Sequence, residues 1–359
     1  MKARPQTRDE VVEAVRESSR VLPVAGRTKP TLATTIDVEL LDLSELSGIV
    51  EYDPSEYVFT AKAGTLVAEV QRTLREHGQY LPFDPPFAEH GSTLGGMAAA
   101  GLNGPGRLRF GGIRDFLIGV TFVDGGGCLS KGGGKVVKNA AGFDFPKFFV
   151  GSLGRFGVLT ELSFKVFPQP ENYVTLRIPH NDLAAGMEGV LRIASSPWEP
   201  DALEIESSGE VFLRLGGTET ALPQRVECIL GELSGMGERL ADEEADKFWR
   251  EANAFGWASP EAMLIKVPVT LNRILELDEF LISVGAERRY GMAGNVAWLA
   301  WPAEKPVAEL DVGLRKLGLG GLVFRGDAMR VNLGKWTSGT ITRAVKAAFD
   351  PEDKFPSIS

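Results

Sequence analysis

The sequence predicts a mixed α+β fold of two domains, and three observations support this. The chain has 359 residues, a length that suits two domains. Its 42 glycines exceed the usual share of about 7% and are concentrated before residue 160. After residues 167–171, F-P-Q-P-E, glycine becomes sparse and strand and helix patterns alternate, which indicates a domain junction.

Composition and charge exclude several classes of protein. The formal net charge of −9 argues against a nucleic-acid-binding protein or one that binds an anionic membrane surface. No apolar run approaches the roughly 20 residues that a membrane-spanning helix needs, and the charged first ten residues lack the apolar core of a signal peptide. We therefore expect a cytoplasmic protein. Cys128 and Cys228 are the only cysteines, so the chain cannot itself hold an iron–sulfur cluster.

The first glycine-containing segment follows a short strand. T-R-D-E at residues 7–10 is a capping-box pattern that predicts a helix ending near Ser19, and residues 21–24 predict a strand. The next residues are Ala25, Gly26, Arg27, Thr28 and Lys29. Free amides, a hydroxyl and two cations after a strand suit a phosphate or diphosphate, whereas the alternative is a solvated turn.

The second segment is G-S-T-L-G-G-M-A-A-A-G, residues 91–101. Before it, residues 36–42, 48–52 and 57–63 read as strands, and a helix runs from Gly64 to Gly78. Ser92 and Thr93 are candidate N-caps, and Gly95 and Gly96 give the start of a helix almost no bulk. Such a helix start lets an anionic group approach free amides, although tight helix packing is the alternative.

The third segment, residues 135–166, contains Gly142, Gly151, Gly154 and Gly157 and runs into an alternating strand from Val158 to Val166. This alternation predicts a rigid, half-buried strand beside backbone that can present amides to a ligand. The alternative is a loop-rich hairpin without a ligand. Neither the dinucleotide fingerprint G-x-G-x-x-G nor a P-loop occurs, so three distant segments would share one long ligand.

Six ordered pieces between about residues 5 and 170 resemble a known family. They are P-V-A-G-R-T-K-P, L-P-F-D-P-P, T-L-G-G-M-A-A-A-G, G-G-I-R-D-F, K-N-A-A-G-F-D, and V-G-S-L-G-R-F-G-V-L-T-E-L-S-F-K-V-F-P-Q-P. The chain resembles the FAD-binding domain of the vanillyl-alcohol oxidase / p-cresol methylhydroxylase (PCMH-type) family, and within it the FAD-binding subunits of bacterial glycolate oxidases. The resemblance implies FAD lying between two α/β subdomains.

The same resemblance implies the cofactor contacts. The loop from Ala25 to Lys29 would wrap the diphosphate, and Ser92, Thr93, Gly95 and Gly96 would line the phosphates and ribityl chain. The flavin and adenosine portions would be held by Asn139, Gly142, Asp144, Gly157 and Val158. Relatives with covalently attached flavin often carry a histidine in the first loop. Here that loop is G-R-T-K, so FAD is expected to bind non-covalently.

The second half is expected to form an α+β cap of antiparallel sheet and helices. Helical patterns occur at 182–195, 219–234, 242–255, 271–283 and 303–316, and strand patterns at 173–178, 202–207, 210–215, 262–269, 294–301 and 321–325. A last helix over 338–349 leads to F-D-P-E-D-K-F-P, which resembles the family's closing motif. The expected domains are therefore 1–168 (FAD-binding), 169–337 (cap for substrate or partner) and 338–359, a segment returning to the first domain.

The second half departs from the hydroxy-acid dehydrogenases of this family. Those relatives carry a run like G-D-G-N-L-H, whereas G-M-A-G-N-V-A-W at 291–298 has Trp298 where the histidine would fall. With His77, His90 and His180 as the only histidines, no metal site is expected and the catalytic base is unassigned. Arg288, Arg325, Arg330 and Lys335 could hold a substrate carboxylate, but surface or ion-pair roles are favoured for each.

These observations predict an FAD-dependent oxidoreductase subunit. The resemblance implies oxidation of a 2-hydroxy acid such as glycolate or D-lactate, in a complex with a second flavin subunit and an iron–sulfur subunit, through which the chain could lie peripherally at the inner membrane. Two alternatives stay open. One is a free-standing FAD oxidase or dehydrogenase of a small alcohol or acid, and the other is a non-catalytic scaffold that holds flavin.

Overall fold

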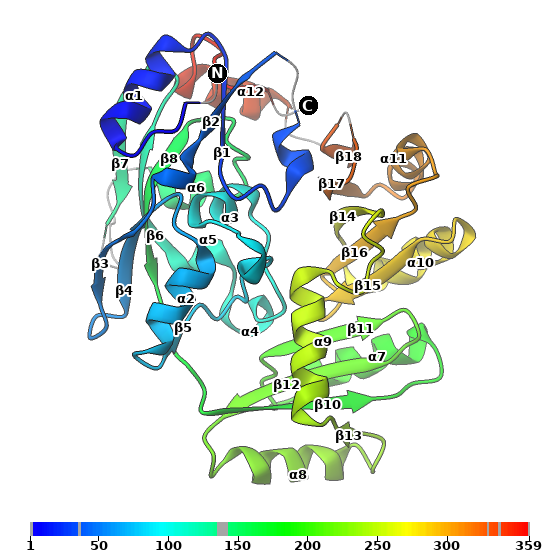
Figure 1. Cartoon of the computed structure of the whole chain (residues 1–359). Coiled ribbons are helices and arrows are strands. Elements are labelled where there is room, and N and C mark those ends of the chain that lie inside the picture. Colours follow the sequence, from blue (N-terminus) through cyan, green and yellow to red (C-terminus); the bar gives the residue numbers. More distant parts are fainter. Residues whose placement is uncertain (1–2, 35–36, 135–142, 329, 337–338, 358–359) are drawn as a thin grey trace. The chain divides into compact units, whose positions relative to one another are not determined.

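A computed structural model divides the chain into two compact units (Figure 1). Unit 1 comprises residues 1–103, 111–169 and 337–359, and unit 2 comprises residues 104–110 and 170–336. The described residues are 3–34, 37–134, 143–328, 330–336 and 339–357. None of the helices in these ranges is both long and apolar enough to cross a membrane.

Unit 1 begins with helix α1 (Arg8–Glu17), which packs on two parallel strands, β1 (Val21–Val24) and β2 (Glu39–Asp42). One of the two hydrogen bonds of the predicted capping box is confirmed: the Thr7 hydroxyl accepts a hydrogen bond from the Glu10 amide at 3.3 Å. Val11 and Val15 on one face of α1 are fully buried in the same apolar cluster as β1 and β2. This packing fixes the point where the chain leaves β1 for the segment 25–29.

The main sheet of unit 1 has five antiparallel strands in the order β3-β4-β8-β6-β7. They are β3 (Ile49–Asp53), β4 (Val58–Lys62), β8 (Val158–Lys165), β6 (Leu117–Val123) and β7 (Leu129–Gly133). The expectation that β8 is half-buried is wrong. Helices α1 and α3 (Leu94–Ala100) both contact this central strand. Leu159 and Ser163, which alternate with the apolar series, are therefore only 5% and 8% exposed.

Shorter elements complete unit 1. They are η1 (Pro30–Ala33), η2 (Leu43–Glu45), α2 (Val67–Arg75), β5 (Gln79–Tyr80), η3 (Ala88–His90), α5 (Ile113–Phe116), α6 (Phe145–Phe149), β9 (Phe167–Pro168) and α12 (Gly339–Phe349). The C-terminal segment is tied into this unit. Phe349 stacks on Phe148 with ring centroids 4.8 Å apart, the Lys354 carbonyl accepts from the Val21 amide at 2.8 Å, and Phe355 is fully buried.

Unit 2 is built on a nine-stranded antiparallel sheet, confirming the predicted sheet type. Its strands, in spatial order, are β13 (Glu238–Arg239), β10 (Asn172–Ile178), β12 (Val211–Gly217), β11 (Ala202–Glu206), β15 (Glu287–Gly291), β16 (Val296–Trp301), β14 (Met263–Pro268), β17 (Gly320–Arg325) and β18 (Asn332–Gly334). The pattern of residues 287–291, E-R-R-Y-G, did not read as a strand because it carries three charges in five residues.

Helices cover both faces of this sheet. Apolar residues of α7 (Leu183–Ala194), α8 (Leu222–Glu232), α10 (Ile274–Ser283) and α11 (Val307–Lys316) share one core with the strands. On the opposite face lies α9 (Asp242–Ala254), where Phe248 stacks on Phe212 at 3.9 Å and the Trp249 indole donates to Thr175. The short helix α4 (Arg107–Phe110) also belongs to unit 2, and Arg109 pairs with the buried Asp201.

Candidate functional site

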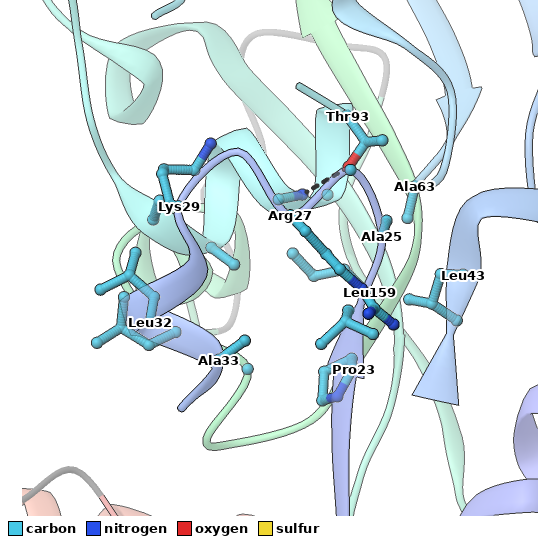
Figure 2. Close-up of a pocket in the computed structure, with 18 of the residues that line it drawn as sticks. Pro23, Ala25, Arg27, Lys29, Leu32, Ala33, Leu43, Ala63, Thr93 and Leu159 are labelled. Carbon is cyan, nitrogen blue, oxygen red and sulfur yellow. Dashed lines mark hydrogen bonds between the residues drawn. The ribbon is translucent and has the colours of Figure 1, made fainter. Parts of the chain in front are cut away.

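A pocket of unit 1 collects residues from the predicted glycine-containing segments (Figure 2). It contains about 800 Å³ of empty space, open solvent at its mouth included. It is lined by Pro23, Val24, Ala25, Gly26, Arg27, Thr28, Lys29, Leu32, Ala33, Leu43, Ala63, Thr93, Gly95, Gly96, Ala99, Ala100, Ser152, Leu153, Gly154, Gly157 and Leu159. The fold thus brings three parts of the chain that are more than 50 residues apart to one cavity.

The first segment contributes two cations whose surroundings differ. Figure 2 shows their side chains leaving the loop in different directions. Arg27 has a left-handed backbone (φ 50°) and its guanidinium lies 3.5 Å from the Asp42 carboxylate. Lys29 donates to the Thr28 hydroxyl at 2.7 Å and to the Ser92 hydroxyl at 3.4 Å, and lies over the Phe87 ring. Burial lowers the pKa of Lys29 to about 8.

The second segment forms the predicted helix start. Thr93 is the N-cap of α3, and its hydroxyl accepts from the Gly96 amide at 3.3 Å. Gly95 packs on Ala63, where an added Cβ would lie 2.9 Å from the alanine Cβ. Ser92 is buried and does not line the pocket; its hydroxyl accepts from Lys29. The Gly95 amide also donates to the Ala63 carbonyl at 2.8 Å, so the amides at this helix start are not free and the alternative of tight packing applies.

The third segment is only partly at the pocket. Gly157 lines it, but the Val158 side chain lies in the apolar cluster with Val11 and Val15. Asp144 is the N-cap of α6 and forms an ion pair with Lys147 at 3.0 Å, so the pocket does not include it either. Asn139 and Gly142 lie outside the described residues, and their predicted roles stay predictions.

Several lining residues were not predicted. Ser152, Leu153 and Gly154 lie in the V-G-S-L-G run that the sequence singled out, so their glycine neighbours were an available signal. Leu32, Leu43 and Ala63 are ordinary apolar residues that only the fold brings here. No local pattern distinguishes such residues from core positions.

The backbone around the pocket fits a cofactor with a long anionic chain. At Gly26 an added Cβ would lie 1.9 Å from the Gly91 carbonyl oxygen, so the first two glycine segments approach each other as closely as glycine allows. The absence of bulk at Gly26, Gly95 and Gly96 leaves main-chain groups at the wall, and Lys29 adds a cation. These features suit the diphosphate of a dinucleotide.

In unit 2 three of the positions considered for chemistry, Trp298, Arg288 and Arg325, have structural partners. Trp298 is 7% exposed and packs edge-to-face on Phe255 with ring centroids 5.0 Å apart. Arg288 binds both oxygens of Asp278, and Arg325 donates to the Ser259 carbonyl at 2.8 Å. Within the described part of the chain, no group of three or more His, Cys, Asp or Glu side chains could hold a metal ion.

Comparisons of sequence identify related proteins. Residues 1–132 match a family described as an FAD binding domain. The chain is 33% identical to glycolate oxidase subunit GlcE of Escherichia coli (strain K12) over 298 residues, 82% of this chain and 80% of that protein. It is 28% identical to glycolate oxidase subunit GlcD of Bacillus subtilis (strain 168) over 207 residues, which are 58% of this chain and 43% of GlcD. A D-lactate dehydrogenase of Anaerostipes hadrus is 29% identical over 165 residues, 46% of this chain and 34% of the relative.

The fold is also found in solved structures. An alkyldihydroxyacetonephosphate synthase superposes with a TM-score of 0.69 at 16% identity, covering 98% of this chain and 74% of the synthase. At that identity the likeness concerns the fold alone. It confirms the α+β architecture expected for the whole chain.

Proposed function

Because the chain belongs to the PCMH-type family of FAD-binding oxidoreductases, we propose that it is the FAD-binding subunit of a complex that oxidises a small 2-hydroxy acid such as glycolate or D-lactate. The partners would be a second flavin subunit, which would carry the substrate chemistry, and an iron–sulfur subunit that takes the electrons. One observation carries the proposal. The likeness to glycolate oxidase subunit GlcE extends over 298 residues, well beyond residues 1–132 that match the FAD-binding family.

The pocket residues would hold FAD without a covalent bond. Bound FAD would supply the acceptor for the electron pair taken from the substrate. The segment from Ala25 to Lys29 would offer amides and a cation to the diphosphate, and Gly95 and Gly96 at the start of α3 would leave room for it because they carry no side chain. Leu32, Leu43 and Leu159 would exclude water from the apolar parts of the cofactor.

The pKa of Lys29 predicts a pH dependence of FAD binding. Burial lowers this pKa to about 8 in the free chain, and a bound diphosphate would raise it. Binding above pH 8 must therefore take up a proton, so the Kd for FAD should increase by up to about tenfold per pH unit from pH 8 upward. Fluorescence titrations between pH 7 and 9.5 measure this effect, and Lys29→Met should remove the slope.

The lowered pKa of Lys29 also affects the stability of the chain without FAD, and there a higher pH is favourable. Unfolded lysine binds a proton up to about pH 10.4, so the unfolded state holds more protons than the native state between pH 8 and that value. The contribution of Lys29 to stability should therefore rise with pH over this window.

A Kd for FAD that is constant from pH 7 to 9.5 would contradict contact between Lys29 and the diphosphate.

Turnover measurements test the assignment as a dependent subunit. The chain, loaded with FAD, is assayed with glycolate and D-lactate and an artificial electron acceptor, first alone and then with the flavin and iron–sulfur subunits of the same source. We expect turnover only in the reconstituted complex. As a control, the complex is reconstituted from the same partners and protein stripped of FAD. Its turnover rate should be lower than that of the complex with FAD-loaded protein.

Other outcomes would favour the alternatives. Fast turnover by the isolated chain would contradict the dependent-subunit proposal, and hydrogen peroxide formation would then indicate a free-standing oxidase. A flavin in this chain that substrate never bleaches, even within the active complex, would indicate a scaffold role. Following the flavin absorbance under anaerobic conditions distinguishes these cases.

A further inference from the structure

The segment 25–29 at the pocket wall has main-chain amides without acceptors. None of the amides of its last four residues donates a hydrogen bond to another group in the described part of the chain. These four residues line the pocket, and Gly26 and Arg27 among them are exposed. The start of α3 differs, because the amides of Gly95 and Gly96 already have acceptors. Successive free amides on a surface that a ligand can reach suit an anion.

Arg27 has a left-handed backbone within this segment (φ 50°). A residue with a Cβ is disfavoured in that conformation, and glycine is the residue that usually occupies such positions. The conformation of residue 27 also sets the directions in which the neighbouring amides point. The arginine is therefore held here against its backbone preference, and another contact must offset that cost.

Asp42 provides a contact that can offset this cost. One of its carboxylate oxygens lies 3.5 Å from the Arg27 guanidinium, and the Asp42 side chain is only 9% exposed. The other oxygen accepts from the Ser44 amide at 3.2 Å, and the Asp42 amide donates to the Ala3 carbonyl at 2.9 Å. The parallel register of β1 and β2 places Asp42 beside Val24, the last residue of β1. The carboxylate is therefore fixed close to the point where the segment begins.

An ordinary surface ion pair explains these contacts less well. Exposed pairs contribute little to stability because water screens both charges. The Asp42 carboxylate is buried, and Arg4, a second cation near it, lies 4.0 Å away with a side chain that is 59% exposed. Arg27 is therefore the nearer of these two cations to a buried charge. An ion pair alone does not require a left-handed arginine, whereas a segment that presents free amides to a ligand does require a fixed conformation.

We infer that Asp42 is a positioning residue of the cofactor site: by holding the Arg27 side chain, it fixes the left-handed backbone of residue 27 and so the amides that bind the diphosphate. The inference rests on the cofactor site proposed above and adds Asp42 to it, although Asp42 does not line the pocket. It also changes the role of Arg27, whose guanidinium holds the segment in place and does not bind the phosphates. Lys29, whose side chain leaves the loop in a different direction, remains the cation for the diphosphate (Figure 2).

Two substitutions of Arg27 separate the effect of its backbone from that of its guanidinium. Arg27→Ala and Arg27→Gly both remove the charge, but only glycine adopts the left-handed conformation without a steric cost. With the chain stripped of flavin, we expect the Kd for FAD to be about 5- to 30-fold higher in Arg27→Ala than in Arg27→Gly. This comparison leaves Asp42 unchanged, so it remains informative if a variant of Asp42 fails to fold.

A double-mutant cycle tests the role of Asp42. Asp42→Asn removes the charge but keeps an oxygen that can accept from the Ser44 amide at the start of η2. We expect it to raise the Kd for FAD, and for ADP, which carries the diphosphate without flavin, by about fivefold. In the Arg27→Gly background the same substitution should change both constants by less than twofold, because glycine needs no ion pair to hold it. The Kd for riboflavin, which lacks phosphate, should stay within twofold throughout.

Glu45→Gln is the matched control. Glu45 lies three positions after Asp42, pairs with Arg4 at 3.6 Å, and has a side chain that is 40% exposed. The substitution removes the same formal charge from the same stretch of chain without touching Arg27. It should leave the Kd for FAD and for ADP within twofold of the parent.

Three results would overturn the inference. Tighter binding of FAD by Asp42→Asn would show that the carboxylate keeps Arg27 away from the phosphates. Equal losses of affinity in Arg27→Ala and Arg27→Gly would show that the guanidinium binds the cofactor directly. A lower melting temperature of Asp42→Asn with unchanged Kd for FAD and ADP would show that Asp42 serves only the stability of unit 1. None of these results depends on which acid is oxidised, so a failure of the proposed reaction would be seen separately.

Discussion

Replacing Gly26 by alanine is expected to weaken FAD binding by up to about 100-fold. The new Cβ would lie 1.9 Å from the Gly91 carbonyl oxygen. Because this oxygen belongs to the backbone, no side-chain rotation can relieve the clash. The segment from Ala25 to Lys29 would shift to relieve the clash, and binding would have to restore its position. Overpacking of this kind costs about 1–3 kcal/mol, and the upper end corresponds to roughly a 100-fold change in Kd. Equilibrium titration of the stripped protein with FAD measures the effect.

A matched glycine provides the control. Gly231 lies inside α8, and an added Cβ there would meet no atom within 4 Å. Gly231→Ala should leave FAD affinity unchanged and stabilise the fold by up to about 1 kcal/mol, since alanine is the better helix former. Wild-type affinity in Gly26→Ala would show that the close contact with Gly91 does not shape the cofactor pocket.

Replacing Asp278 by alanine is expected to destabilise unit 2 by about 3–5 kcal/mol, the cost of leaving a buried charge without its partner. Arg288 donates to both carboxylate oxygens of Asp278, and the buried Tyr290 hydroxyl donates to one of them at 2.5 Å. Burial, reinforced by the bond to Asp278, raises the pKa of Tyr290 above its usual value. Removing the carboxylate therefore leaves a guanidinium and a hydroxyl unsatisfied at once. Urea unfolding followed by tryptophan fluorescence measures the loss.

An exposed ion pair provides the comparison. Asp242 lies 3.3 Å from Arg239, and its side chain is 81% exposed. Asp242→Ala should change the free energy of unfolding by less than about 1 kcal/mol because water screens such pairs. If Asp278→Ala and Asp242→Ala lowered the free energy of unfolding by equally small amounts, the buried network would stabilise unit 2 no more than an exposed ion pair does.

Much of the architecture could be predicted from local patterns. Alternating apolar residues predict β4 and β10 because a strand turns successive side chains to opposite faces of a sheet, and the continuous apolar run V-A-W-L-A-W predicts β16. The capping pattern at Thr7 marked the start of α1. β15 was missed because its arginines are neutralised by Asp278 and Glu206, which are distant in sequence. Local patterns cannot reveal partners that only the fold supplies.

The candidate site, too, could be predicted from the sequence only in part. The glycine segments predicted where the backbone would be free of bulk, and Gly26, Gly95, Gly96 and Gly157 do line one pocket. The pairing of Arg27 with Asp42 could not be predicted, because it depends on the parallel register that places Val24 beside Asp42.

The division of the chain into units has a consequence for its synthesis. The polypeptide changes unit after residues 103, 110, 169 and 336. Lys354 near its end bonds to Val21 near its start, with its side chain also reaching the Val15 carbonyl. The region that carries the pocket therefore cannot be completed on the ribosome until almost the whole polypeptide has emerged. A shortened product ending before residue 349 would leave Val21 and Val15 without these contacts, and neither unit can be obtained intact by a single cut.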